Sequence, residues 1–267
     1  MLSKNLVKYI HGLELKKNRL REGLFVAEGP KVVEDLLRTY PPARLFGTKE
    51  WRMTIARQAP PTPFADATFE EVTEEELRKM SFLQHPQMVL ALFFIPHQAT
   101  QSEEDLWSAL PLNGLYLALD GVQDPGNLGT IIRIADWFGI STIICSRDTA
   151  DAFNPKVIQA TMGSIARVDV VYTDLDKFLE EAPHGLPIYG TLLDGSNIYQ
   201  QQLTHNGIIV MGNEGNGISE KIKAKINKRL LIPQFQAGGG ADSLNVAIAT
   251  AITCSEFKRQ SLSSPTG

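Results

Sequence analysis

Five polar residues, spread over three short stretches of the sequence, have side chains suited to holding and aligning a ligand. An amide and a guanidinium follow the apolar run 115–119, a carboxylate lies within the glycine-rich stretch GNEGNG, and a hydroxyl and an amide open an apolar segment. Taken singly, each has an ordinary explanation, because Asn and Ser cap helices and lone charged side chains face solvent. These residues are Asn127, Arg133, Glu214, Ser243 and Asn245.

The elements that must position these residues follow from the hydrophobic pattern. From residue 114 onward, short apolar runs alternate with helical patterns, which predicts an α/β fold with a mostly parallel sheet. Ligands of such sheets gather at the carboxyl ends of the strands, so chemistry is expected in the loops 120–127, 212–218 and 233–243. The predicted strands are 115–119, 140–145, 188–192, 208–211 and 229–232, and the predicted helices are 127–138, 154–163, 174–182, 219–226 and 243–258.

Two of these helices have polar residues at their predicted starts, where a side-chain oxygen can accept a hydrogen bond from a free N–H of the first turn. Asn127 is the predicted cap of one helix, and Asp242 or Ser243 is the predicted cap of the other. The segment 244–252 is apolar nearly all round, so this last helix is expected to be buried, in part against a second copy of the chain.

The first part of the chain predicts a smaller α/β unit. It has a polar helical pattern near 3–20, a strand at 24–27, a helix at 30–38 that begins with Pro30, and an apolar run of strand length at 88–95. The polar, proline-containing stretch after this run marks a domain boundary, with a short helix near 102–109. The predicted organisation is 1–98, a linker 99–113, a second domain 114–260 and a disordered tail 261–267.

Charge is unevenly distributed in this chain of 267 residues, whose net charge is −4. Residues 1–31 hold seven basic against three acidic side chains, and the stretch 220–229 holds five basic side chains against Glu220 alone. Local basic patches suffice for a polyanion partner, although solvated helix faces also explain such runs.

Composition and spacing argue against several classes of protein. No apolar run approaches the roughly 20 residues that cross a bilayer, and no signal-peptide pattern opens the chain. The two cysteines each lie in an apolar segment, which predicts buried thiols and a cytoplasmic protein, and the five histidines lack metal-ligand spacing. No glycine-rich dinucleotide fingerprint follows the first strand of the second domain, and no Gly-Lys-Ser/Thr phosphate loop occurs.

Together, the three stretches resemble the motifs of the SpoU (TrmH-type) RNA 2′-O-ribose methyltransferases of the SPOUT superfamily. The sequences DPGNLGTIIR, GNEGNG and SLNVAIA carry this resemblance and occur in the family's order. Through KNLVKYI, LFVAEG and HPQMVLALF, the first ninety-odd residues are similar to the family's substrate-binding domain, which has a ribosomal-protein-like fold. The stretch QFQAGGGAD departs from the pattern, because it is longer and richer in glycine than the usual connection.

This resemblance implies an α/β domain with a deep trefoil knot that binds S-adenosylmethionine, and an active site shared across a homodimer. The implied activity is methyl transfer to a ribose 2′-hydroxyl of structured RNA, ribosomal or transfer. The residues expected to contact the cofactor, much of it through backbone groups, are Thr191, Leu192, Met211, Gly212, Ile232 and Leu244. Neither a metal nor a membrane is implied.

Within this family reading, Arg133 grips the phosphate beside the target ribose, because its fork of donors matches phosphate oxygens. An arginine side chain stays protonated in proteins, which argues against Arg133 as the base. Asn127 and Asn245 would orient Arg133 or the ribose, Glu214 would anchor its loop or Arg133, and Ser243 would cap its helix while contacting the site. Two alternatives stay open: an RNA-binding protein of this fold without methyl transfer, and a dinucleotide-dependent oxidoreductase.

Overall fold

The computed structural model describes residues 2–55, 68–96, 106–236 and 243–263. The chain divides into two compact units, 1–97 with 151–166 and 98–150 with 167–267. The segment 151–166 lies inside the range predicted for the second domain, and the predicted domain boundaries stay a prediction. Residues 99–105 of the predicted linker, the glycine-rich positions 237–242 and the tail residues 264–267 lie outside the described residues.

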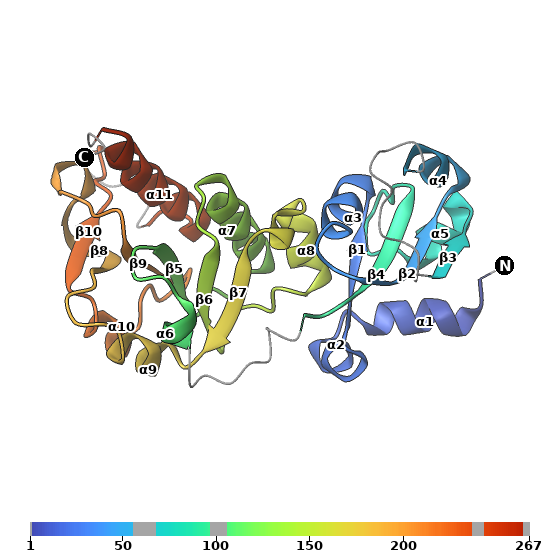
Figure 1. The fold of residues 1–267 in the computed structure, drawn as a ribbon, viewed down its shortest axis with the longest axis horizontal. Helices are drawn as coiled ribbons and strands as arrows, with labels where there is room; N and C mark the ends of the chain where they lie inside the picture. The colour runs from blue at the N-terminus through green and yellow to red at the C-terminus, as the bar shows by residue number, and fades with distance from the viewer. Residues whose placement is uncertain (1, 56–67, 97–105, 237–242, 264–267) are drawn as a thin grey trace. The chain divides into compact units, whose positions relative to one another are not determined.

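The first unit is built on a four-stranded mixed sheet with the order β1-β4-β2-β3 (Figure 1). The apolar run near 88–95 forms the inner strand β4, which pairs antiparallel with both β1 and β2 and is buried over most of its length. The elements of this unit are α1 (Lys4–Gly12), α2 (Lys16–Glu22), β1 (Leu24–Glu28), α3 (Pro30–Leu36), β2 (Pro42–Gly47), α4 (Lys49–Ile55), β3 (Thr68–Glu71), α5 (Glu74–Met80), β4 (Val89–Phe94), α8 (Pro155–Thr161) and the 3₁₀ turn η3 (Ser164–Ala166).

The helix predicted near 3–20 is interrupted, because side chains take up backbone carbonyls between α1 and α2. The Asn18 amide donates to the carbonyl of Gly12 (2.7 Å), and the Arg19 guanidinium donates to the carbonyls of Leu13 (2.8 Å) and Glu14 (2.7 Å). Arg19 is buried and also forms an ion pair with Asp151. One of the basic residues counted as surface charge is therefore internal.

The second unit is built on a six-stranded sheet with the order β10-β8-β9-β5-β6-β7, and every neighbouring pair is parallel. The predicted mostly parallel sheet is confirmed. The elements are α6 (Leu106–Ala109), β5 (Leu115–Asp120), α7 (Pro125–Trp137), β6 (Thr142–Ser146), β7 (Asp169–Thr173), α9 (Leu175–Glu180), β8 (Ile188–Asn197), the 3₁₀ turn η4 (Ile198–Gln200), β9 (Gly207–Gly212), α10 (Glu220–Lys223), β10 (Lys228–Leu231) and α11 (Val246–Ser263).

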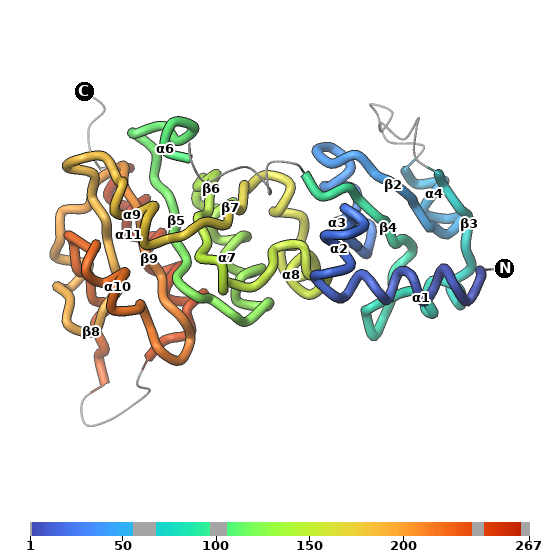
Figure 2. The backbone as a smooth tube through the Cα atoms, turned by 90° about the horizontal axis from the view of Figure 1, so that it is seen from below, coloured from blue at the N-terminus to red at the C-terminus, as the bar shows by residue number. Residues whose placement is uncertain are grey.

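Helices cover both faces of this sheet, as the two views show (Figures 1 and 2). Successive side chains of a strand point to opposite faces. Tyr116 and Ala118 join a core cluster with residues of α9 and α10, and α6 packs against it. The remaining helices, α7 and α11, pack against each other and against the neighbouring strands. Cys145 and Cys254 are buried free thiols, as predicted.

Several element boundaries differ from the predictions. β7 was not predicted, α10 is shorter than the expected 219–226, and β8 extends five residues beyond the expected end at 192. The last helix begins at Val246 rather than at 243 and continues to Ser263, three residues into the expected tail. In the described part of the chain, no helix is long and apolar enough to span a membrane.

Candidate active site

Two of the three predicted loops leave neighbouring strands at the same edge of the sheet. β5 and β9 pair in parallel, with Asp120 opposite Gly212 at their carboxyl ends. The chain passes from β5 to β6 and β7 on one side and returns with β8, β9 and β10 on the other. Ligands of open α/β sheets bind at such a reversal of strand order. The loops 121–124 and 213–217 therefore frame the candidate site.

The glycine-rich loop 213–217 is a tight turn held by its own backbone. Asn213 and Gly217 exchange two backbone hydrogen bonds (2.9 and 3.0 Å), and the Asn213 side chain accepts from the N–H groups of Gly215 (2.9 Å) and Asn216 (3.1 Å). Gly217 has a φ of 66°, a conformation that favours glycine. A side chain on Gly212 would collide with the backbone of Gly217 and the residue after it, so the strand end accepts only glycine without rearrangement.

Further hydrogen bonds join the two loops. The buried carboxylate of Asp120 accepts from the backbone N–H of Ser219 (2.7 Å), and the Asn213 side chain donates to the carbonyl of Gly121 (2.7 Å). Sequence reasoning missed both Asp120 and Asn213 as site-building residues. The available signal for Asp120 was a carboxylate at the end of a buried strand, because such a group requires hydrogen-bond donors.

Glu214 fastens the same loops and also reaches the next helix. Its carboxylate accepts from the backbone N–H groups of Gln123 (3.3 Å) and Asp124 (3.2 Å) and from the side-chain amide of Asn127 (2.9 Å). The carbonyl oxygen of the Asn127 side chain accepts in turn from the amide of Asn245 (2.9 Å). One polar residue from each of the three sequence motifs is thus joined in a single chain of hydrogen bonds.

The helix caps differ from the prediction, and this difference leaves the side-chain amide of Asn127 available to the site. Asp124 is the cap of α7 and accepts from the backbone N–H of Asn127 (2.8 Å), so Asn127 stands inside the first turn. Asn245, not Ser243, accepts from two backbone N–H groups at the start of α11 (3.0 and 3.3 Å). The predicted caps Asn127 and Ser243 were wrong, and Asp242 lies outside the described residues. A proline as first helical residue after Asp124 was the signal for the true start.

Arg133 and Ser243 stand apart from this hydrogen-bond chain. Both side chains are exposed, and neither forms a hydrogen bond or ion pair with the described residues. The carboxylate of Asp136, one turn along α7 from Arg133, is held by the guanidinium of Arg167 (2.8–3.1 Å). Glu214 was expected to anchor either its own loop or Arg133. In the structure it anchors its own loop to the first motif. The guanidinium of Arg133 is consequently free to meet an anion.

The electrostatics of Glu214 follow from these contacts. Partial burial acts to raise its pKa, but the hydrogen bonds from Asn127 and from backbone N–H groups lower it, and the net pKa lies below the usual glutamate value. Hydrogen bonds to a carboxylate favour its charged form. Glu214 is therefore an ionised acceptor at neutral pH.

The expected cofactor residues lie where β8 separates from its neighbours. β8 and β9 stop pairing after Gly190 and Val210, and residues 191–195 have no partner in β10, since Arg229 pairs with Gly190 and Leu230 with Ser196. Thr191 lies in this excursion, and its hydroxyl contacts the sulfur of Met211 (3.6 Å).

The remaining expected contacts lie at neighbouring element ends. Leu192 follows Thr191, Gly212 ends β9, Ile232 follows β10, and the half-exposed Leu244 precedes α11. Strand ends that stop pairing leave backbone N–H and C=O groups for a ligand, and apolar side chains suit a flat ring. The set fits S-adenosylmethionine, whose adenine and ribose need backbone hydrogen bonds and an apolar wall.

The basic cluster at 221–229 is largely neutralised, contrary to the charge count. Lys223 pairs with Glu220 (2.7 Å), Lys225 with Glu180 (3.3 Å) and Asp176 (3.8 Å), and Arg229 with Asp194 (2.6 Å). Three of the five basic side chains thus have carboxylate partners, whereas Lys221 and Lys228 form no ion pair with the described residues. Among the described residues, no group of three or more His, Cys, Asp or Glu side chains could hold a metal ion.

Comparison with known proteins defines the class to which this fold and site belong. Residues 114–255 match the model of the SpoU rRNA Methylase family, and residues 4–91 match that of the MRM3-like substrate binding domain. The chain therefore belongs to the SpoU rRNA methylase family. It is an RNA 2′-O-methyltransferase that uses S-adenosylmethionine, as the sequence motifs indicated.

Individual relatives agree over nearly the full length of the chain. A Bacillus subtilis 23S rRNA (guanosine(2553)-2′-O)-methyltransferase, RlmP, is 32% identical over 90% of both chains. A TrmH-family structure from Porphyromonas gingivalis is 40% identical, with a TM-score of 0.81 and coverage of 97% of this chain and 99% of that one. An AdoMet-bound rRNA methyltransferase from Sinorhizobium meliloti is 30% identical, with a TM-score of 0.76 and coverage of 97% and 96%.

Proposed function

We propose that this chain methylates a ribose 2′-hydroxyl of ribosomal RNA at the edge of the β5–β9 sheet. The observation that carries the proposal is the hydrogen-bond chain Asn245–Asn127–Glu214, which joins the three motifs, with Arg133 exposed further along α7. The named relatives RlmP and the Sinorhizobium enzyme act on ribosomal RNA, which favours ribosomal over transfer RNA as the substrate.

Arg133 holds the phosphate next to the target ribose. It is exposed and has no carboxylate partner among the described residues, so its full set of donors is available for phosphate oxygens. S-adenosylmethionine, when bound, supplies an activated methyl group on a sulfonium. The protein then needs only to align the hydroxyl with that methyl group and to ease the loss of its proton.

Asn127, Glu214 and Asn245 preorganise the site. Because Glu214 is satisfied by donors of the first motif, it fixes the loop that follows β9 against the start of α7. Asn245 holds the start of α11 against the same helix. Ser243, exposed just before Asn245, faces solvent and is free to contact the ribose or the cofactor.

Thr191, Leu192, Met211, Gly212, Ile232 and Leu244 form the proposed cofactor site. Its support is the separation of β8 from β9 and β10 at the carboxyl ends of these strands. In the family, this region is threaded as a trefoil knot, and we extend that topology to this chain.

A homodimer is proposed for the functional state. The helices α7 and α11 pack against each other, and each also presents a large apolar side chain to solvent. Trp137 on α7 is 85% exposed, and Ile248 on α11 is 52% exposed. Apolar groups of this size are favoured at interfaces, so this surface is the proposed contact between two copies.

One experiment tests the activity and separates the alternatives. The protein is incubated with methyl-labelled S-adenosylmethionine and ribosomal RNA from cells that lack it, and the digested nucleosides are resolved by mass spectrometry. We expect a single 2′-O-methylated nucleoside species to gain label. RNA binding without any transfer would support the non-catalytic alternative, and saturable NAD binding without binding of S-adenosylmethionine would support the oxidoreductase.

A further inference from the structure

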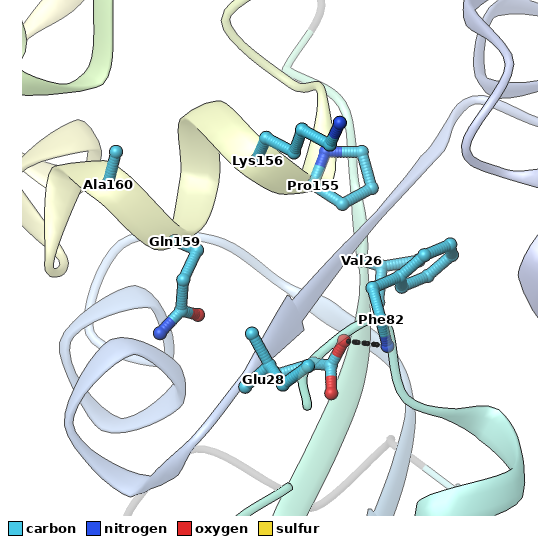
Figure 3. A pocket seen from close by; sticks show the side chains of 8 residues that line it. Val26, Glu28, Phe82, Pro155, Lys156, Gln159 and Ala160 are labelled. Carbon is cyan, nitrogen blue, oxygen red and sulfur yellow. Dashed lines mark hydrogen bonds between the residues drawn. The ribbon is translucent and has the colours of Figure 1, made fainter. Parts of the chain in front are cut away.

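A pocket of about 290 Å³ lies within the first unit, between the edge strand β1, the segment after α5 and the helix α8 (Figure 3). This volume is close to the lower limit of about 300 Å³ for small-molecule pockets, so the pocket has room for one planar ring system and few additional atoms. Val26, Phe82 and Pro155 contribute apolar walls. None of the five motif residues lines this pocket, and the methyl-transfer site therefore does not account for it.

A buried carboxylate forms part of the pocket. Glu28, at the end of β1, is 5% exposed and accepts hydrogen bonds from the hydroxyl of Ser81 and from the backbone N–H of Phe82 (2.8 Å). A carboxylate has about four acceptor sites, so it can accept two further donors after these bonds. Burial raises the pKa of Glu28, and the two hydrogen bonds act in the opposite direction. Additional N–H donors from a ligand would favour its ionised form.

Two polar side chains of α8 complete the lining. In the view of Figure 3, Gln159 extends from α8 on the side opposite Phe82, with Glu28 between them. The Gln159 amide forms no hydrogen bond with any described residue, and Lys156 is exposed with no ion pair in the same part of the chain. The pocket thus offers an acceptor, an unused amide, an aromatic ring and a cation.

From this arrangement we infer that the pocket binds an unstacked guanosine nucleotide of the RNA substrate. Proteins read single-stranded RNA by stacking splayed bases on aromatic rings and by hydrogen bonding to their edges. Guanine alone among the four bases carries two adjacent N–H donors on its Watson–Crick edge, which match a carboxylate. Phe82 would stack on the base, Glu28 would accept its two donors, Gln159 would contact its remaining edge, and Lys156 would bind the phosphate.

This inference rests on the proposed function only in requiring an RNA substrate. Glu28 and Phe82 lie within residues 4–91, which match the substrate binding domain model, whereas Lys156 and Gln159 lie within residues 114–255, which match the SpoU model. The nucleotide contact is a specificity determinant and takes no part in methyl transfer. Loss of the pocket should accordingly weaken RNA recognition while leaving the chemical step intact.

The test measures binding of labelled pentaribonucleotides to the full chain by fluorescence anisotropy. One probe has a central guanosine and the other a central adenosine, both flanked by uridines. The hydrogen bonds that only guanine can donate to the Glu28 carboxylate predict a preference for guanosine of about tenfold or more. Stacking on Phe82 should stabilise both probes, because every base has an aromatic face. Phe82→Leu and Gln159→Ala should each lower guanosine affinity about tenfold, and Lys156→Ala should weaken both probes equally. Gln202→Ala and Lys221→Ala, at exposed positions outside the pocket, should match the parent.

Two controls keep this result separate from the catalytic proposal. Arg133→Ala should retain the guanosine preference, and in ribosomal RNA assays Gln159→Ala should raise KM while kcat stays within about twofold of the parent. Equal affinity of the parent for both probes, or unchanged affinity of Phe82→Leu and Gln159→Ala, would overturn the inference. A parent that binds guanosine selectively but transfers no methyl group would instead refute the proposed function alone.

Discussion

The side-chain amide of Asn127 is shared between two motifs: its nitrogen donates to Glu214 and its oxygen accepts from Asn245, both at 2.9 Å. An amide is well suited to this position, because it donates at one end and accepts at the other. The residues that flank it in space lie 87 and 118 positions away in the sequence. Each contact therefore forms only when the tertiary structure of the site is in place.

Replacement of Asn127 by Asp is expected to be worse than replacement by Ala. Asp removes the donor and places a second carboxylate beside Glu214, whereas Ala only deletes the two hydrogen bonds. We expect a loss of unfolding free energy of about 1–3 kcal/mol for Asn127→Asp at pH 7, and a smaller loss for Asn127→Ala. Urea denaturation of both variants measures the difference. Equal stability of the two would contradict the assigned contacts.

Arg133→Ala should remove most methyl transfer and leave cofactor affinity nearly unchanged. Loss of one preorganised charged contact predicts a fall of about a hundredfold in single-turnover rate at saturating RNA and cofactor. Arg133→Lys should fail almost as badly, because a point charge cannot reproduce a two-pronged contact. Arg78→Ala, at another exposed arginine, is the matched control. A near-parental rate for Arg133→Ala would remove the basis of the proposed site.

A pair of glycine variants tests the packing of the loop after β9. A methyl group on Gly212 would collide with the backbone of Gly217, whereas one on Gly215 would make only an ordinary contact with the Asn213 side chain, at 3.6 Å. Gly212→Ala should therefore cost about 1–3 kcal/mol or more in unfolding free energy and weaken cofactor binding. Gly215→Ala should leave both within the error of calorimetry. The reverse order would show that the turn is not built as described.

The lowered pKa of Glu214 predicts an acid-sensitive contribution to stability. Because the folded-state pKa lies below the unfolded value of about 4.3, this contribution is fully present above that value. It is lost as the pH falls through the folded pKa. Unfolding free energy measured from pH 7 to pH 3 should fall less steeply for Glu214→Gln than for the parent. Identical slopes would contradict the depressed pKa.

Two substitutions in α11 separate the proposed dimer contact from the core of one chain. Ala247 is only 3% exposed within one chain, so Ala247→Asp should unfold the unit whatever its oligomeric state. Ile248 is half-exposed, and Ile248→Asp should give folded monomers. Light scattering coupled to size exclusion reads the mass, and circular dichroism reads the fold. A parent protein that is monomeric at micromolar concentration would contradict the proposed homodimer.

The sequence predicted the fold and the meeting of the motifs because both depend on strong signals. Strands β5 and β9 are uninterrupted apolar runs, and polar loops that follow such strands must emerge at one edge of a parallel sheet. In contrast, β7 (DVVYT) was missed because it is short, edge-located and only partly buried. The sequence of β7 alone does not distinguish a strand from a loop, because this strand depends on its pairing with β6.

Helix starts were predicted less well, because nearby residues in the sequence compete for the capping position. Asp124 and Asn127 are both good caps, and so are Ser243 and Asn245, and composition alone does not rank them. Tertiary contacts settle the first case, because Glu214 and Asn245 engage the Asn127 side chain and leave Asp124 to cap the helix. The break after α1 has a similar origin, since a buried Arg19 takes the carbonyls there.

The Asp120 and Glu214 contacts also have a consequence for hydrogen exchange. The amide protons of Gln123, Asp124 and Ser219 are held by carboxylates about 90 to 99 residues distant in the sequence, so their protection depends on both loops being in place. Neither loop can open without releasing amides of the other, and the three should exchange with one common opening free energy. Although β5 and β9 belong to separate segments of the chain, the loops at their ends should behave as one cooperative unit.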